Sequence, residues 1–191
     1  MTVAESYEHA MRTKPAPGDL RLVQGFVNTI DFESDTDLIG DPDLLATWLV
    51  ELGLMPSGDD AGPADVTRAH DVREALRALL HANHGNELPT AALATLNAAA
   101  QRGHVMVRFG DEESVLTAAA PGVDGALGRL LGIVHTAMAD GSWERLKACR
   151  QDTCQWAFYD RSKNRSGSWC SMDSCGNRAK ARAYRQRRRP D

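Results

Sequence analysis

Four cysteines are the residues of this chain whose type and spacing are best suited to binding a metal ion. They all lie within the last 43 residues, at Cys149, Cys154, Cys170 and Cys175. Four residues separate the members of each pair, and fifteen residues separate the two pairs. Two short cysteine pairs joined by a spacer of about this length are typical of a structural zinc site. The spacing therefore predicts that Zn²⁺ is bound by four thiolates, which leave no open position for catalysis.

Two disulfides and four unrelated buried thiols are the alternatives to a zinc site. The N-terminus carries Glu5 and Glu8 where a signal peptide needs a basic start and an apolar core. No apolar run approaches the roughly 18 residues that span a bilayer. We therefore expect a cytoplasmic protein with no membrane partner. A reducing cytoplasm keeps thiols free for metal ions, which favours zinc over disulfides.

Basic residues are concentrated in the same C-terminal region. The whole chain has 191 residues and a formal net charge of −4. From Trp143 onward it holds 13 Lys or Arg against 5 Asp or Glu, so the preceding 142 residues carry a net charge of −12. One stripe at helical spacing comprises Arg178, Arg182, Arg185 and Arg189, with Lys180 beside it. Such a stripe repels itself unless a polyanion lies on it, which favours phosphate binding with counterion release.

A second basic group lies in the loop between the two cysteine pairs. It comprises Arg161, Lys163, Asn164 and Arg165. Contacts with base edges are best suited to Asn164, Asn177 and Arg178, because these side chains can form two hydrogen bonds with one base. The alternative is that both asparagines only cap turns and the start of a helix. The nearby aromatic residues Trp156, Phe158, Tyr159 and Trp169 either stack on single-stranded bases or form the core of a small zinc module.

The residues before Trp143 are expected to form a mainly helical body. The spacing of apolar residues predicts helices over 20–30, 42–52, 65–83, 89–100 and 123–139. In the helix over 42–52, Leu44 is expected on the buried stripe. In the helix over 65–83, Arg68, Arg73 and Arg77 are expected to point outward. Alternating apolar residues predict a β-hairpin over 105–118. Residues 1–18 are expected to form a flexible arm, because they end in a stretch rich in Pro and Gly.

The body offers only weak candidates for a small-molecule site. Asn28 and Thr29 belong to its best polar cluster, which either anchors a ligand or closes the first helix. His81 and His84 lie at a helix end, where they either bind a metal or face the helix dipole. The sequence contains no recognisable nucleophile, paired-carboxylate signature or phosphate-binding loop. We therefore expect no catalytic residues and no enzymatic activity.

The region around the cysteines resembles the CGNR zinc-finger family. The string that names the family stands here as Cys175-Gly176-Asn177-Arg178. The alanine-rich body resembles the ABATE domain that precedes this finger, with Phe26-Val27-Asn28-Thr29 near its start. The resemblance implies a bacterial DNA-binding transcription regulator with a treble-clef-like finger, whose last ligand pair leads into a helix. Gly167 and Ser168 depart from the family pattern, which often continues with arginines there.

These features together predict a mainly α (α+β) protein in three parts. They are a flexible arm (1–18), a helical ABATE-like domain (19–142) and a four-cysteine zinc finger with a basic C-terminal helix (143–191). We expect the finger to bind double-stranded DNA through this helix and the basic loop, and the body to sense a small-molecule effector or form a homodimer. The alternatives are an RNA- or ribosome-associated binding protein and, less favoured, an enzyme with its site in the body.

Overall fold

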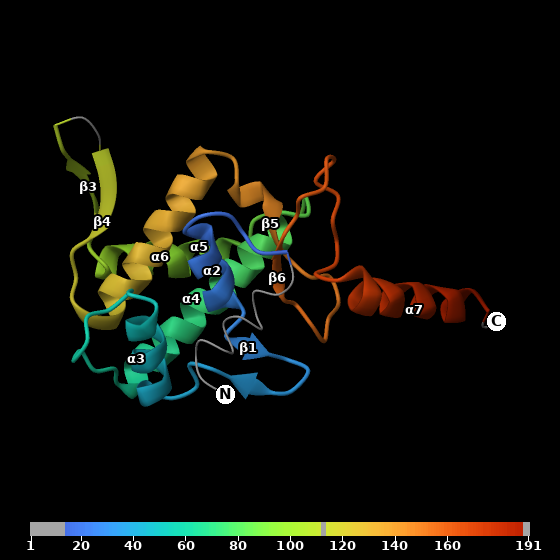
Figure 1. Ribbon diagram of the computed structural model, residues 1–191, viewed down its shortest axis with the longest axis horizontal. Helices are drawn as coiled ribbons and strands as arrows, with labels where there is room; N and C mark the ends of the chain where they lie inside the picture. The colour runs from blue at the N-terminus through green and yellow to red at the C-terminus, as the bar shows by residue number, and fades with distance from the viewer. Residues whose placement is uncertain (1–13, 112–113, 189–191) are drawn as a thin grey trace.

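The computed structural model describes residues 14–111 and 114–188 (Figure 1). In chain order the elements are α2 (Leu20–Val27), β1 (Ile30–Asp31), β2 (Thr36–Asp37), α3 (Pro42–Glu51), α4 (Pro63–Ala82), α5 (Thr90–Arg102), β3 (Val105–Phe109), β4 (Ser114–Ala118), α6 (Gly122–Ala139), the 3-10 helix η1 (Trp143–Arg145), β5 (Leu146–Ala148), β6 (Ala157–Tyr159), the short π-helix η2 (Met172–Gly176) and α7 (Asn177–Arg187). In this part of the chain, no helix combines the length and apolarity needed to span a membrane. The predicted mainly helical architecture with a small β-hairpin is confirmed, and the described residues form two further two-stranded antiparallel sheets, β1–β2 and β5–β6.

The core of the body forms where α2, α3, α5 and α6 pack around α4. The Phe26 and Trp48 rings lie 5.7 Å apart between α2 and α3, and both side chains are fully buried. The α3 helix begins as its sequence predicts: Pro42 is its first residue and the Asp41 carboxylate accepts the Leu44 N–H at 2.9 Å. The prediction for the Leu44 side chain was wrong, because 41% of its surface is exposed.

Two arginines of α4 that were predicted to face solvent are buried. Arg73 and Arg77 each expose only 3% of their surface. Arg73 donates to the Asp37 carboxylate at 2.8 Å, and Glu74 accepts a hydrogen bond from each arginine at 2.9 Å. A buried charge is tolerated when it is paired and its donors are satisfied. The helical period places these residues correctly on α4, but it does not reveal the partners that other segments bring to them.

The predicted hairpin formed by β3 and β4 is confirmed, with Val105 paired to Ala118 and Phe109 to Ser114. Its base packs on α6 at Gly128, where a Cβ atom would lie 2.8 Å from the Cβ of Ala118. A glycine is therefore needed for this close approach. The hairpin and α7 project from opposite ends of the molecule (Figure 1).

The C-terminal region shares the hydrophobic core of the body. Leu146 and Ala148 of β5 and Ala157 of β6 are fully buried in the same cluster as the body helices. Of the predicted flexible arm, residues 1–13 lie outside the described residues. Residues 14–18 are anchored, because the Lys14 carbonyl accepts the Tyr159 N–H at 2.9 Å and Ala16 is buried.

Candidate zinc centre and basic surface

The four predicted ligands converge on one buried point. Their sulfur atoms all lie within 4.8 Å of one another, although the residues come from the end of β5, two loop segments and η2: Cys149 directly follows β5, and Cys175 lies in η2. The sulfur of Cys154 lies 3.6 Å from that of Cys170, which lies 3.7 Å from that of Cys175. In a tetrahedral zinc site with Zn–S bonds of about 2.3 Å, the sulfurs are about 3.8 Å apart. The cluster therefore has the spacing of four thiolates around one ion.

The chemistry of the cluster also fits a divalent cation. All four cysteines are free thiols in the structure, so the alternative of two disulfides does not describe it. Hydrogen bonds from Cys154 and Cys170 lower the pKa of Cys149 to about 2. The contact with Cys149, together with burial, raises the pKa of Cys154. Without a cation the cluster favours one thiolate and opposes the next, whereas Zn²⁺ would stabilise all four and link the turns that carry them.

The finger surrounds this cluster with a small apolar core. Phe158 is fully buried against the cysteines, and Trp156 and Trp169 are packed at its margin. Cys149 follows β5 and Cys154 lies in the turn that leads to β6, whereas Cys175 lies in η2 directly before α7. The last ligand pair therefore leads into a helix, as in a treble clef. The packing supports the core role for these aromatic residues over base stacking.

Side chains of the body hold the finger by forming hydrogen bonds with the backbone of the finger. The Asn28 amide pairs with the peptide groups of Ala157: its Oδ1 accepts the N–H at 2.7 Å and its Nδ2 donates to the carbonyl at 3.0 Å. Gln24 donates to the same carbonyl at 3.1 Å. Asn28 and Thr29 are both buried, and the Thr29 hydroxyl donates to the Phe26 carbonyl. In the structure the polar cluster predicted as a weak ligand site therefore forms other contacts. Asn28 binds the finger backbone, and Thr29 binds the backbone at the end of α2.

The C-terminal half of α4 and the turn that follows it continue this connection. Arg77 donates to the Gln155 carbonyl, next to Cys154, at 2.8 Å, and to the Val27 carbonyl at 2.6 Å. His84 lies 2.7 Å from the carbonyl of Ala148, which precedes Cys149. Asn83 donates to the Leu146 carbonyl at 2.8 Å. The roles of Arg77 and Asn83 beside the cysteine cluster could not be predicted, because nothing in their local sequence indicates contact with a segment more than 60 residues away.

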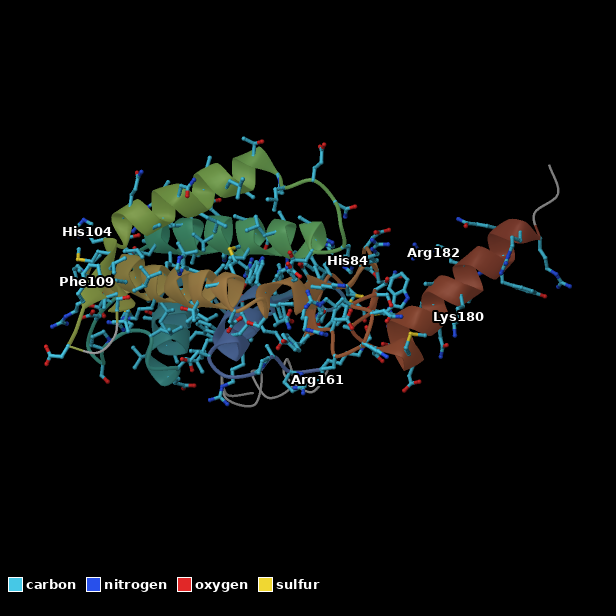
Figure 2. The ribbon with its side chains drawn as sticks, turned by 90° about the horizontal axis from the view of Figure 1, so that it is seen from above. His84, His104, Phe109, Arg161, Lys180 and Arg182 are labelled. Carbon is cyan, nitrogen blue, oxygen red and sulfur yellow. The ribbon has the colours of Figure 1, made fainter. Side chains whose placement is uncertain are left out.

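The basic residues of α7 lie on a helix that projects from the finger (Figure 2). Arg178 forms an ion pair with Glu33, which lies between β1 and β2, and Arg182 donates to Gln151 at 3.2 Å. Lys180 is exposed, and no polar partner of its side chain is found among the described residues. Arg185 donates to the Ala181 carbonyl of its own helix at 3.3 Å, and Arg189 lies outside the described residues. Asn177 donates to the Asp173 carbonyl at 3.1 Å, which supports its role as a cap.

The loop residues predicted to bind nucleic acid occupy a different part of the finger from α7. Arg161 donates to the Pro15 carbonyl at 2.9 Å, and Figure 2 shows it beside the body. Arg165 forms an ion pair with Glu144. Lys163 and Asn164 are exposed, and their side chains have no hydrogen bond or ion pair within the described part of the chain. These loop residues therefore lie outside α7, in the segment between β6 and η2.

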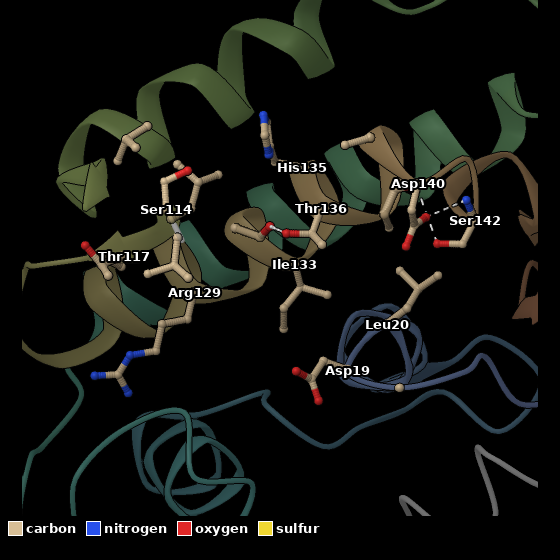
Figure 3. Close-up of a pocket in the computed structure, with 18 of the residues that line it drawn as sticks. Asp19, Leu20, Ser114, Thr117, Arg129, Ile133, His135, Thr136, Asp140 and Ser142 are labelled. Atoms are coloured by element: carbon tan, nitrogen blue, oxygen red, sulfur yellow. Dashed lines mark hydrogen bonds between the residues drawn. The ribbon is translucent and has the colours of Figure 1, made fainter. Parts of the chain in front are cut away.

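The body also contains an open groove of about 1150 Å³ between the β3–β4 hairpin, α6 and residues 17–20 (Figure 3). Leu20 and Ile133 contribute apolar side chains to it, and Asp19, Arg129 and His135 contribute polar ones. Neither Asn28 nor Thr29 lines this groove. This groove has room for a ligand, and its lining residues are not among the candidates predicted from the sequence.

Comparison with protein families gives two matches in the order of the two parts described above. Residues 20–141 match the ABATE family, whose description is "Putative stress-induced transcription regulator", and residues 145–188 match the CGNR zinc finger. Neither description names an enzyme. No curated protein matches the chain. Because the first match covers more than half of the 191 residues, the chain belongs to the ABATE family of transcription regulators and ends in a CGNR zinc finger.

Proposed function

We propose that this regulator binds double-stranded DNA and that α7 is its main contact. The observation that carries the proposal is the placement of five basic residues and no acidic residue in α7, with Arg188 directly after it, on a helix that projects from the finger (Figures 1 and 2). With 11 residues the helix is about 16 Å long. Its basic side chains repel one another in water, so a polyanion lying along the helix would stabilise it.

The shape of α7 favours duplex DNA over double-stranded RNA. A helix with its side chains is about 10–12 Å across, and the major groove of B-form DNA is about 12 Å wide. The major groove of A-form RNA is deep and too narrow for side chains to read. An RNA-binding protein remains the second candidate, because the same positive charge attracts any nucleic acid.

Affinity measured against salt concentration tests the proposal. We expect zinc-loaded protein to bind a duplex of mixed sequence, with log K falling linearly against log salt and a slope of about −0.9 for each phosphate contacted. Lys180→Gln and Arg185→Gln should each reduce the slope by about one contact. A slope near zero would refute polyanion binding, and stronger competition by structured RNA than by duplex DNA would favour the second candidate.

The body is proposed to modulate binding through a groove along α6 and through the β3–β4 hairpin, which lies at the end opposite α7. The open groove offers room for a small-molecule effector with an apolar part and a polar group. The adjacent hairpin exposes Val107 and Phe109, the latter by 83%, so a second copy of the chain is the other proposed partner of this end. Analytical ultracentrifugation of the wild type and of Phe109→Ser separates these roles, since only a dimer contact would change the sedimenting mass.

A further inference from the structure

The basic loop between β6 and Trp169 is closed at its base by a buried ion pair. Lys147 of β5 lies with its Nζ 3.2 Å from Oδ2 of Asp160, the residue that follows β6. Each residue exposes only 3% of its surface. The Asp160 carboxylate also accepts the N–H of Ser162 at 3.0 Å and that of Gly167 at 2.7 Å. One carboxylate thus ties both ends of the loop together.

Further contacts hold the same loop. The Lys147 ammonium also donates to the Arg165 carbonyl, and Arg145 donates to the carbonyls of Asp160 at 3.0 Å and Ser162 at 3.1 Å. At Gly167 a Cβ atom would lie 2.7 Å from Cγ of Asp160. The carboxylate therefore occupies the space that any other side chain at position 167 would fill, which explains the glycine there.

A buried ion pair is a poor means of stabilising a fold, because desolvation offsets most of the attraction. Its distinctive contribution here is geometric, since it fixes the ends of a loop that presents Lys163 and Asn164 to solvent without partners among the described residues. We propose that Lys147 and Asp160 are positioning residues that hold this loop in one shape, so that it forms a second nucleic-acid backbone contact separate from α7. The inference rests on the proposed function, because it requires a nucleic acid as the ligand.

Removing the Asp160 charge should change nucleic-acid affinity in opposite directions, depending on whether net charge or the shape of the loop decides it. Asp160→Asn makes the protein more positive by one charge, and this change by itself should strengthen binding to a polyanion. Loss of the loop geometry should instead weaken binding by roughly three- to tenfold at moderate salt, the effect of losing about one phosphate contact. Asp71→Asn is a matched control, because Asp71 is exposed on α4 and the same charge is removed there.

The test measures duplex DNA affinity for zinc-loaded wild type, Asp160→Asn and Asp71→Asn, with zinc content determined for each. We expect full zinc content in all three and weaker binding only in Asp160→Asn. Gly167→Ala disturbs the loop without removing a buried charge, and it should weaken binding in the same direction. Lys163→Gln should weaken binding of the wild type but have a smaller effect in the Asp160→Asn background, because the two changes act on one contact.

Limited trypsin digestion gives a readout that does not depend on nucleic acid. Cleavage after Lys163, located by mass spectrometry, should be faster in Asp160→Asn and Gly167→Ala than in wild type. Unchanged cleavage, or DNA binding by both variants as strong as that of wild type, would overturn the positioning role while leaving the proposed function in place. Wild-type protein that shows no salt-dependent binding would overturn the proposed function and this inference with it.

Discussion

Replacing Asn28 by Ala should destabilise the zinc-loaded protein by about 3 kcal/mol. The change removes two hydrogen bonds with Ala157, and the one donated to its carbonyl contributes about 1 kcal/mol. It also leaves the Ala157 N–H buried without a partner, which costs about 1–3 kcal/mol, whereas the Ala157 carbonyl keeps its bond from Gln24. For a chain of this size the melting temperature should fall by about 6–12 °C. Urea and thermal unfolding of zinc-saturated protein measure both quantities.

Asn97→Ala is the control for this experiment, because Asn97 is exposed on α5 and its replacement should change stability by less than about 0.5 kcal/mol. A ligand-anchoring Asn28 would behave differently, since its loss would leave the unfolding free energy unchanged and remove only ligand binding. If Asn28→Ala and Asn97→Ala unfold at the same urea concentration as the wild type, the connection between body and finger through Ala157 is refuted.

Three further predictions concern the ion pairs and the metal. Glu33→Gln frees Arg178 from an exposed ion pair, so duplex DNA affinity measured by fluorescence anisotropy should rise by up to about fivefold; an equal rise in Glu87→Gln would attribute the gain to net charge instead. Removing zinc with a chelator should unfold the finger and abolish DNA binding, and zinc rebinding should release protons that a pH indicator detects. Burial raises the pKa of Asp160, but hydrogen bonds from Ser162 and Gly167 and the Lys147 ammonium lower it to about 2. At pH 7 this carboxylate should therefore contribute about 2 kcal/mol relative to its protonated form, and urea unfolding of zinc-loaded Asp160→Asn, which mimics that form, should show a loss of about this size.

Features that depend on nearby residues could be predicted from the sequence. The four cysteines lie in two short segments, so their spacing alone indicated one metal site, and the structure brings their sulfur atoms together. The β3–β4 hairpin follows from alternating apolar residues on either side of a turn. The helix α7 follows from alanine and arginine at helical spacing after a family motif. In each case the determining residues lie within about 25 positions of one another.

Features that depend on remote partners could not be predicted in this way. Asn28 and Ala157 are separated by 129 residues, and Arg77 and Gln155 by 78. A polar residue near a helix end is equally compatible with a ligand contact and with a contact to another part of the chain. The short pairing of β1 with β2 was also missed, because strands of two residues carry no alternating pattern. The arrangement of body and finger therefore required the three-dimensional structure.

The negative charge of the body affects where a nucleic acid could approach the molecule. Its net charge of −12 repels a phosphate backbone, so duplex DNA should approach the projecting end of the molecule, where α7 lies. One acidic segment of the body, however, reaches this end, because Glu33 pairs with Arg178 at the start of α7. A phosphate that binds Arg178 must compete with this carboxylate. If the finger binds DNA as proposed, we expect the position of the β1–β2 turn to influence its affinity, and Asp37 connects this turn to Arg73 and hence to the centre of α4.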